Sequence, residues 1–187
     1  MIEILRWSEL SGNGEGERAL EQLTEIFFAT TTKSTFSNHE ERSQFFDRWA
    51  GQYLKESPER VYLVRASSSL NWQGYLISSL RQDLCPFPLQ SYLRDYPAHL
   101  HMNCHPHFQG QGLGRALIQR LCQDLRKESV LGVHAITSLG ASNVAFYRRL
   151  GFVEYQQAPW ALMGLSLQPE KQQIGVVFPP EPPESPA

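Results

Sequence analysis

Three glycines at alternate positions, just before a run with helical periodicity, are the residues whose spacing points most directly to chemistry. Gly110, Gly112 and Gly114 precede apolar residues at positions 113, 117, 118 and 121. Because glycine has no Cβ and tolerates positive φ, such a loop lets the backbone approach a ligand closely. The first N–H groups of a helix point out of its N-terminus, where the helix dipole favours an anion. The pattern therefore predicts a cradle for phosphate groups.

The residues around these glycines argue against two common phosphate-binding loops. A P-loop ends in Gly-Lys-Ser/Thr, with the lysine on phosphate and the hydroxyl on magnesium. Here Arg115 and Ala116 follow Gly114, so metal-assisted phosphoryl transfer is not expected. A dinucleotide-binding fold requires G-x-G-x-x-G early in a chain of repeated βαβ units. The present glycines have a different spacing and lie past the middle of the chain.

A second motif follows the glycines. Residues 143–152 read Asn-Val-Ala-Phe-Tyr-Arg-Arg-Leu-Gly-Phe, and a strand-like stretch at 132–137 separates them from the first motif. The first motif, as Gln109-x-x-Gly112-x-Gly114, resembles the acetyl-CoA pyrophosphate loop of the GNAT acetyltransferase family. The second resembles that family's last helix and the turn into its final strands. Two motifs in this order are more specific than either alone.

The resemblance implies a fold and an activity. The fold would be α/β (α+β): a central mixed, mostly antiparallel sheet of about seven strands flanked by helices, with a β-α-β-α unit that binds acetyl-CoA. The activity would be that of an N-acetyltransferase, in which an amine of a small molecule or protein attacks acetyl-CoA directly in a ternary complex. Acetyl-CoA would be the co-substrate, and no metal is implied.

Upstream residues resemble one branch of this family. Tyr-Pro-Ala-His-Leu-His at 96–101, followed by Pro106 and Phe108-Gln109-Gly110, is similar to the acetyltransferase-like domain of animal O-GlcNAc hydrolases and its free-standing bacterial relatives. This resemblance covers roughly residues 20–165. Some domains of that branch have been regarded as pseudo-acetyltransferases. The resemblance to this branch therefore also implies an alternative function, that of a catalytically inactive acyl-CoA-binding or protein-interaction module.

The resemblance further implies where acetyl-CoA would lie. Residues 110–115 would hold the pyrophosphate, so the thioester would lie back along the predicted strand 99–105. Backbone groups near Asn103, Cys104 and His105 would pair with pantetheine and polarise the thioester carbonyl, and such positioning lowers the reaction barrier. The expected cofactor-binding residues are Asn103, Cys104, His105, Gln109, Gly110, Gln111, Gly112, Leu113, Gly114, Arg115, Asn143 and Tyr147.

Tyr147 is the expected general acid, because the tyrosine of this motif protonates the departing CoA thiolate in similar enzymes. A phenol with a reference pKa of about 10 stays protonated at neutral pH. The alternative is an amphipathic core tyrosine. Asn143 would hydrogen-bond pantetheine or cap its helix. Many relatives place that asparagine seven residues before the tyrosine, where this chain has Gly140.

The attacking amine must lose a proton, and the predicted strand offers histidines for this step. Strand alternation places His99, His101, Asn103 and His105 on one face. His101 is the expected base by its position, acting directly or through water; the alternative is a hydrogen-bonded structural histidine. Relatives commonly carry an acidic residue where Asn103 stands. If that acidic residue is the general base of those relatives, this chain has lost that base or uses another residue for the role.

A metal site is not expected. The histidines could converge on zinc only with ligands from another element, and Cys104 would point to the opposite face. No C-x-x-C or H-E-x-x-H spacing accompanies them. A serine hydrolase is not expected either, because no G-x-S-x-G motif occurs.

Hydrophobic periodicity places the motifs on elements. Strands are predicted at 2–7, 61–64, 74–77, 99–105, 131–137, 152–157 and 160–167, and helices at 17–28, 38–54, 113–127 and 142–150. Asn38 is a predicted N-cap, and 61–64 with 74–77 a predicted hairpin. Residues 81–97 read as a long loop which, with residues 29–40, would wall the acceptor pocket.

Bulk properties limit the classes of partner and location. The 187 residues fit a single domain over 1–178, with a disordered proline-rich tail at 179–187. A net charge of −2 gives no reason to expect nucleic acid or an anionic membrane. No apolar run approaches a bilayer span, no signal peptide is evident, and the cysteines (85, 104 and 122) form no C-x-x-C pair. We therefore expect a cytoplasmic protein; such folds often pair as homodimers through their final strands.

Overall fold

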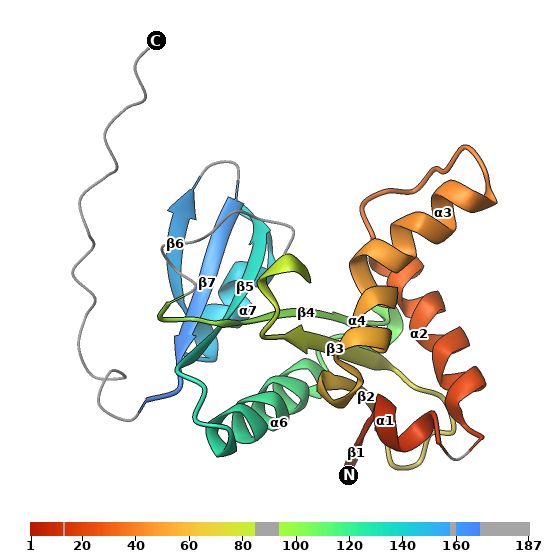
Figure 1. The fold of residues 1–187 in the computed structure, drawn as a ribbon, viewed down its shortest axis with the longest axis horizontal. Helices are drawn as coiled ribbons and strands as arrows, with labels where there is room; N and C mark the ends of the chain where they lie inside the picture. The colour runs from red at the N-terminus through yellow and green to blue at the C-terminus, as the bar shows by residue number, and fades with distance from the viewer. Residues whose placement is uncertain (13, 85–93, 158–159, 169–187) are drawn as a thin grey trace.

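A seven-stranded sheet forms the framework of the molecule in a computed structural model that describes residues 1–12, 14–84, 94–157 and 160–168 (Figure 1). The strand order is β1-β2-β3-β4-β5-β7-β6. All neighbours are antiparallel except β4 and β5. The strands are β1 Ile2–Arg6, β2 Val61–Ala66, β3 Gly74–Ser79, β4 Ala98–Cys104, β5 Gly132–Ser138, β6 Val153–Gln157 and β7 Trp160–Ser166. The predicted α+β fold with a mixed, mostly antiparallel sheet is confirmed.

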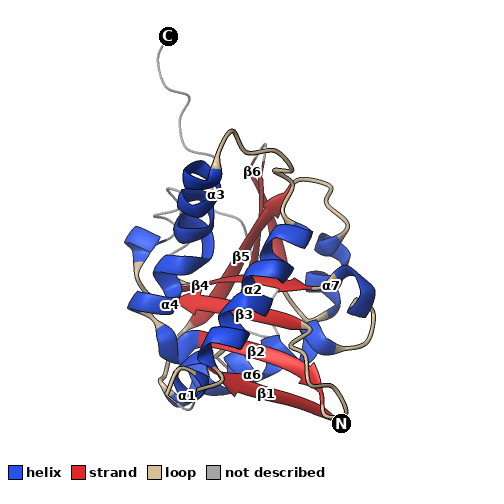
Figure 2. Ribbon diagram, turned by 90° about the vertical axis from the view of Figure 1, so that its right-hand side faces the viewer, coloured by secondary structure: helices blue, strands red, loops and turns tan. Residues whose placement is uncertain are grey.

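Helices cover both faces of the sheet, because successive strand residues point to opposite sides (Figure 2). On β2, Val61 and Leu63 pack in a core with α2, whereas Tyr62 and Val64 pack in a second core with α6. Both cores are closed by apolar helix faces. The helices are α1 Trp7–Leu10, α2 Gly16–Thr30, α3 His39–Phe46, α4 Gln52–Glu56, α6 Leu113–Lys127 and α7 Asn143–Arg149.

The second predicted helix, 38–54, is interrupted in the structure. Asn38 is its N-cap, as predicted, and the side chain accepts a hydrogen bond from the Glu41 N–H at 2.8 Å. Residues Asp47–Gly51 then form a π-helical turn between α3 and α4. A Cβ at Gly51 would lie 2.6 Å from the Asp47 carboxylate, so the glycine makes room for that side chain in the wider turn. Apolar periodicity alone did not indicate this turn.

The other predicted elements are present with small differences at their ends. The helix at 113–127 coincides with α6, and the hairpin is formed by β2 and β3. The first strand ends one residue earlier than predicted and continues into α1, whose start is fixed by the Arg6 N–H donating to Glu9 at 2.7 Å. In the predicted loop 81–97, Gln82–Leu84 form a 3-10 turn. Residues 85–93 and the predicted tail lie outside the described part of the chain.

Candidate acyl-transfer site

A fork between β4 and β5 lies at the centre of the molecule (Figure 1). The two strands pair at three positions, from Ala98 with Val133 to Leu100 with Ala135, and then separate although β4 continues to Cys104 and β5 to Ser138. In a parallel pair the following residues would continue the ladder. Because the two strands separate after Leu100 and Ala135, the later backbone groups of β4 have no strand partner on the side that faces β5.

The hydrogen bonds of β4 show which backbone groups face the fork. The His105 N–H donates to Gln73 O at 2.9 Å, on the β3 side. Because strand residues alternate, the backbone groups of Met102 and Cys104 point to the β5 side. The Cys104 carbonyl there accepts a hydrogen bond from Gln109 Nε2 at 3.2 Å. Of the three positions predicted to contact pantetheine, only Cys104 directs its backbone groups into the fork; those of Asn103, which pairs with Tyr75, and of His105 face the β3 side. Met102, which sequence reasoning did not name, also faces the fork.

The glycine loop ends at the first turn of α6, beside this fork. Gly110 and Gly112 have φ of +76° and +83°, values that favour glycine, and a Cβ at either would meet no atom within 4 Å. The first helical hydrogen bond runs from the Ala116 N–H to Gly112 O at 3.0 Å. The N–H groups of residues 113–115 precede that bond and point out of the helix. This is the geometry predicted for an anion cradle.

Gly114 has a different role from the other two glycines. It lies inside the helix, and a Cβ there would be 3.1 Å from Met102 Cε and 3.3 Å from Phe146 Cζ. It therefore allows α6 to pack closely on β4 and α7. Leu113 beside it is buried in the core under α6, so its backbone alone can face a ligand. The Arg115 side chain is exposed at this first turn and makes no ion pair within the described residues.

Side chains of the loop hold its own backbone. Gln109 binds Cys104 O, and Gln111 Nε2 donates to His107 O at 3.5 Å. The His105 ring contacts the rings of His107 and Phe108, and its Nδ1 accepts from the His107 N–H. The strand ends at Cys104, so His105 belongs to the loop. Its prediction on one strand face with the other histidines is wrong for this reason.

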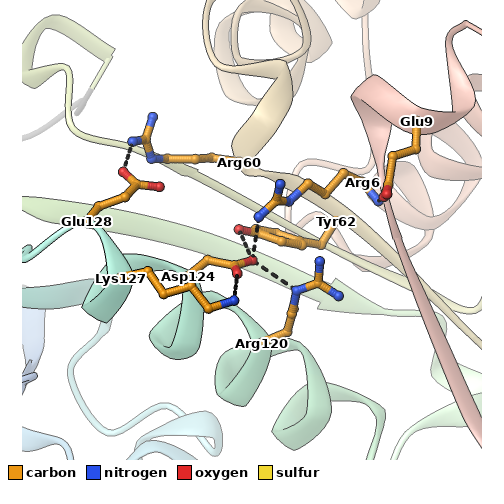
Figure 3. A network of polar contacts seen from close by, with 8 residues as sticks. All are labelled: Arg6, Glu9, Arg60, Tyr62, Arg120, Asp124, Lys127 and Glu128. Atoms are coloured by element: carbon orange, nitrogen blue, oxygen red, sulfur yellow. Dashed lines mark hydrogen bonds and ion pairs between the residues drawn. The ribbon is translucent and has the colours of Figure 1, made fainter.

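A buried ionic cluster fixes α6 to the sheet (Figure 3). The Asp124 side chain, 5% exposed, accepts from Arg6 at 2.9 Å and Arg120 at 2.9 Å, with Lys127 at 3.5 Å. The Tyr62 hydroxyl donates to the same carboxylate at 3.1 Å. Burial would raise the pKa of Asp124, but hydrogen bonds from Arg6 and Arg120 outweigh it and lower the pKa to about 2. The cluster joins β1, β2 and α6, and so holds the helix that carries the glycine loop.

Tyr147 lies in the core that borders the fork. Its ring is 5% exposed and packs against Phe146 and Phe152. Burial raises the pKa of the Tyr147 phenol, and the nearby Cys104 side chain raises it further. Burial also raises the pKa of the Cys104 thiol, to about 11. Both groups are therefore protonated at neutral pH.

His101 and Asn103 are linked in one hydrogen-bonded chain. Asn103 Nδ2 donates to the Tyr75 hydroxyl at 2.8 Å and lies 3.1 Å from His101 Nε2. An amide N–H that approaches Nε2 makes that nitrogen the acceptor and leaves the proton on Nδ1. Burial lowers the pKa of His101, and the backbone of Trp49 in the π-helical turn opposes this only in part. The ring is therefore neutral.

Two further histidines continue this row across the sheet. His99 Nε2 lies 2.5 Å from the Tyr53 hydroxyl, which also donates to Leu84 O. His134, beside it on β5, lies 2.7 Å through Nδ1 from Tyr96 O. Burial lowers the pKa of both, that of His99 to about 3. Strand alternation in the sequence placed His99 in this row of histidines. His134 joins the row only because β5 pairs with β4 in the folded sheet.

Asn143 lies in the first turn of α7 without capping it. Ser142 occupies the N-cap position, and Asn143 Oδ1 accepts from the Thr137 hydroxyl at 2.8 Å. Thr137 belongs to the part of β5 that has left β4. This hydrogen bond connects α7 to the part of β5 that borders the fork. The predicted capping role of Asn143 is wrong.

An aromatic wall stands over His101 on the face opposite α6. We use this name for Phe27, Phe28, Phe36, Phe45, Phe46 and Trp49. The Phe27 ring lies 6.4 Å from the His101 ring and 5.3 to 5.7 Å from Phe46 and Phe45. Phe27 is buried, whereas the other five are partly exposed. This wall includes part of the predicted segment 29–40.

Other site types are not found in the described part of the chain. No group of three His, Cys, Asp or Glu side chains there is arranged to hold a metal ion. None of the described helices has the length and apolar character that crossing a membrane requires. Cys104 and Cys122 are both free thiols.

Comparison with known proteins shows which family and fold this chain is similar to. The family model described as acetyltransferase (GNAT) domain matches residues 87–154, which contain the glycine loop and α7. No curated protein matches the sequence significantly. Solved structures match at low identity over nearly the whole chain, and they establish the fold.

Three of these structures illustrate the likeness. SsHAT is 20% identical, with a TM-score of 0.67 over 89% of this chain and 98% of its own. PaiA N-acetyltransferase from Thermoplasma acidophilum, solved with coenzyme A, is 16% identical, with a TM-score of 0.60 over 89% and 99%. The yncA protein of Salmonella typhimurium, solved with acetyl-CoA, is 17% identical, with a TM-score of 0.56 over 90% and 94%. The chain thus has the GNAT fold and matches the GNAT acetyltransferase family over residues 87–154.

Proposed function

We propose that this protein is an acetyl-CoA-dependent N-acetyltransferase. The observation that carries the proposal is the β4–β5 fork, which opens beside the first turn of α6 and is bordered by Tyr147. Structures of this fold have been solved with acetyl-CoA and coenzyme A, as in yncA and PaiA. The open positions at Gly110 and Gly112 are the space that a pyrophosphate needs against backbone.

Acetyl-CoA would be held by backbone more than by side chains. The N–H groups of residues 113–115 would bind the pyrophosphate, and Arg115 would add a charge at the same turn. The groups of Met102 and Cys104 that face the fork would pair with pantetheine as a strand would. Such an arrangement orients the thioester carbonyl without a reactive side chain.

The transfer requires one proton to leave the amine and one to reach the thiolate. The amine nitrogen forms a bond to the thioester carbon, and the carbon–sulfur bond then breaks. Tyr147 would protonate the departing thiolate, because its phenol carries its proton at neutral pH; the burial that raises its pKa also makes it a weaker acid. His101 would receive the proton that the nitrogen loses after attack, once its Nε2 is released by the Asn103 amide. A weak base suffices at that stage, because the nitrogen carries a positive charge once it has bonded to the thioester carbon and is then strongly acidic.

Thermal unfolding with acetyl-CoA, free CoA and ATP in parallel tests the donor site. A ligand at 100 times its Kd adds about 2.7 kcal/mol, which raises the Tm of a chain this size by roughly 5–11 °C. We expect this shift with acetyl-CoA and CoA but not with ATP. If none of the three shifts the Tm, the glycine loop is not a CoA site.

Gly112→Glu tests the location of that site. The carboxylate would repel the pyrophosphate, so we expect the CoA-dependent shift to disappear. Gly14→Glu is the matched control, because Gly14 has the same φ of +83° and the same open surroundings but precedes α2. It carries the same backbone strain and should keep the shift. CoA binding of wild-type strength by the Gly112 variant would contradict the assignment.

One observation favours the alternative, a catalytically inactive acyl-CoA-binding or interaction protein. Position 103 carries an amide, and no carboxylate contributes to the pKa of His101. A protein without a strong base could bind acetyl-CoA and transfer nothing. Turnover of any amine well above the rate of thioester hydrolysis would rule this alternative out.

The finer assignments from the sequence are also proposals. The segment 96–101 with 106–110 supports kinship with the acetyltransferase-like domain of O-GlcNAc hydrolases. Two free thiols are consistent with a reducing, cytoplasmic location. Pairing through β6, the edge strand of the sheet, would give a homodimer.

A further inference from the structure

We propose that the acceptor is an arylamine, an amine that bears no charge at neutral pH and is attached to an aromatic ring. This inference rests on the proposed acetyl transfer and names its substrate class. Two independent features carry it: the absence of a carboxylate acting on the described groups around the fork, and the aromatic wall over His101.

The described titratable groups around the fork are electrostatically neutral. On the side of the aromatic wall, His101 is flanked by Tyr75 on β3 and by His99 and Asn103 on β4. The α2 side presents Phe27, and the π-helical turn presents the backbone of Trp49. The pKa of His101 is set by burial and that backbone, and the pKa of Tyr147 by burial and Cys104. No carboxylate contributes to either value.

The carboxylates on the surrounding elements already have cationic or amide partners. Glu41 binds Lys33 at 2.6 Å, and Asp47 binds Lys55 at 2.9 Å. Glu40 accepts from the Gln44 amide at 3.1 Å. Glu25 points outward from α2, where it is exposed. The sequences of 85–93 and 158–159 contain neither Asp nor Glu; the acidic residues outside the described part of the chain are Glu170, Glu181 and Glu184, all in 169–187.

The aromatic wall reaches His101 through one ring. Phe27 lies edge-on to His101, and Phe45 and Phe46 pack against Phe27 within 6 Å. Aromatic rings favour edge-to-face and offset contacts at these separations. Cations already lie beside the outer rings of the wall: Arg42 lies 3.5 Å from the Phe28 ring centroid, and Lys33 lies 5.0 Å from that of Phe36. A second cation would meet these positive charges.

These features select against an alkylamine. With a pKa of about 10.4, an alkylamine is neutral in only about one molecule in a thousand near pH 7.4. Its ammonium form would have to enter a site without a counter-ion, which is costly. An arylamine arrives with its nitrogen lone pair free. It attacks the thioester carbon, passes one proton to His101 and leaves CoA thiol protonated by Tyr147, so atoms and charge balance.

Aniline and benzylamine form a matched pair for the test, because one methylene group separates ring from nitrogen in benzylamine and makes that amine basic. CoA thiol release is measured with each at pH 7.0 to 9.0, after acetyl-CoA binding has been verified by thermal shift. We expect kcat/KM for aniline to exceed that for benzylamine by at least about tenfold at pH 7.0. We also expect the aniline rate to stay flat with pH, while the benzylamine rate rises about tenfold from pH 7.0 to 8.0 and less steeply toward pH 9.0, where much of that amine is already neutral.

Asn103→Asp tests the physical cause. A carboxylate at this position would contact Tyr75 and His101 and supply the missing counter-ion, so the ratio of kcat/KM values should move toward benzylamine by about tenfold or more. Cys122→Ser, at a buried site on α6, is the control that should leave the ratio unchanged.

The outcomes separate this inference from the proposed function. If acetyl-CoA does not bind, the proposed function itself fails. If acetyl-CoA binds and benzylamine is acetylated as well as or better than aniline at pH 7.0, the arylamine inference is overturned while acetyl transfer stands. Binding without turnover of either amine also overturns the inference, and it favours the inactive alternative.

Discussion

Gly110, Gly112 and Gly114 are equivalent in the sequence motif, yet the structure gives them two different reasons to be glycine. The first two require positive φ and border open space, which suits a ligand. The third is in a helix and is limited by Met102 and Phe146, which suits packing. A substitution at 114 would therefore disturb the protein's own contacts, whereas one at 112 would act on the ligand.

Tyr147→Phe separates chemistry from binding at the residue scale. Loss of the hydroxyl should lower kcat by about 10²-fold or more, because it removes the general acid, while the Kd for acetyl-CoA changes little. Turnover and CoA binding are measured on the same preparation. Tyr62→Phe is the control: it removes the hydroxyl that donates to Asp124, should cost about 1 kcal/mol of stability and should leave kcat unchanged. An unchanged kcat in the Tyr147 variant would show that Tyr147 is only a packing residue of the core.

At the scale of elements, one carboxylate adds a polar anchor to α6, whose apolar face is already buried in the core. Asp124 connects it to Arg6 at the end of β1 and to Tyr62 on β2. Removing one partner of a buried ion pair leaves the other charges uncompensated, which is more damaging than losing an exposed pair. The position of the glycine loop thus depends on a residue at the far end of the helix.

Asp124→Ala should therefore lower the free energy of unfolding by about 3 kcal/mol, measured by urea denaturation. The matched control is Glu56→Ala, which breaks the exposed pair with Arg81 and should cost less than about 1 kcal/mol. Similar losses in both variants would mean that solvent already screens the Asp124 cluster.

At the scale of the whole molecule, the histidines in the middle of the sheet make stability depend on pH. Burial lowers the pKa of His99, His101 and His134, so the folded protein keeps them neutral. Below pH 6.5 the unfolded chain binds protons that the folded chain does not. Stability is therefore highest above pH 6.5 and falls as pH decreases toward the folded pKa values.

Each of these histidines removes up to about 1.4 kcal/mol per pH unit in that range. The Tm should stay nearly constant from pH 8 to 7 and fall steadily from pH 6.5 to 5. His99→Gln should reduce that slope, because one titrating group is lost. A Tm that is flat between pH 7 and 5 would show that the folded protein takes up these protons freely. Asp124 adds a separate loss as pH falls from about 3.8, where its carboxyl takes up a proton in the unfolded chain, toward about 2, where it does so in the folded protein.

Local pattern was sufficient for most elements of this fold. The apolar run of β2, the N-cap at Asn38 and the periodicity of α6 are short-range properties, and each predicted its element. The π-helical turn at Asp47–Gly51 and the helical turn after β1 were missed, because they depend on single side-chain contacts of Asp47 and Glu9.

By itself, the sequence determined the glycine loop, the helix that follows it and the fold, because these depend on backbone freedom, periodicity and local spacing. Only the tertiary structure decided which groups surround the fork. It separated β4 from β5 after three pairs, assigned His105 to the loop, and brought Phe27, Tyr75 and His134 to the histidines of β4. Those contacts join residues far apart in the chain, and their geometry follows from how whole elements pack.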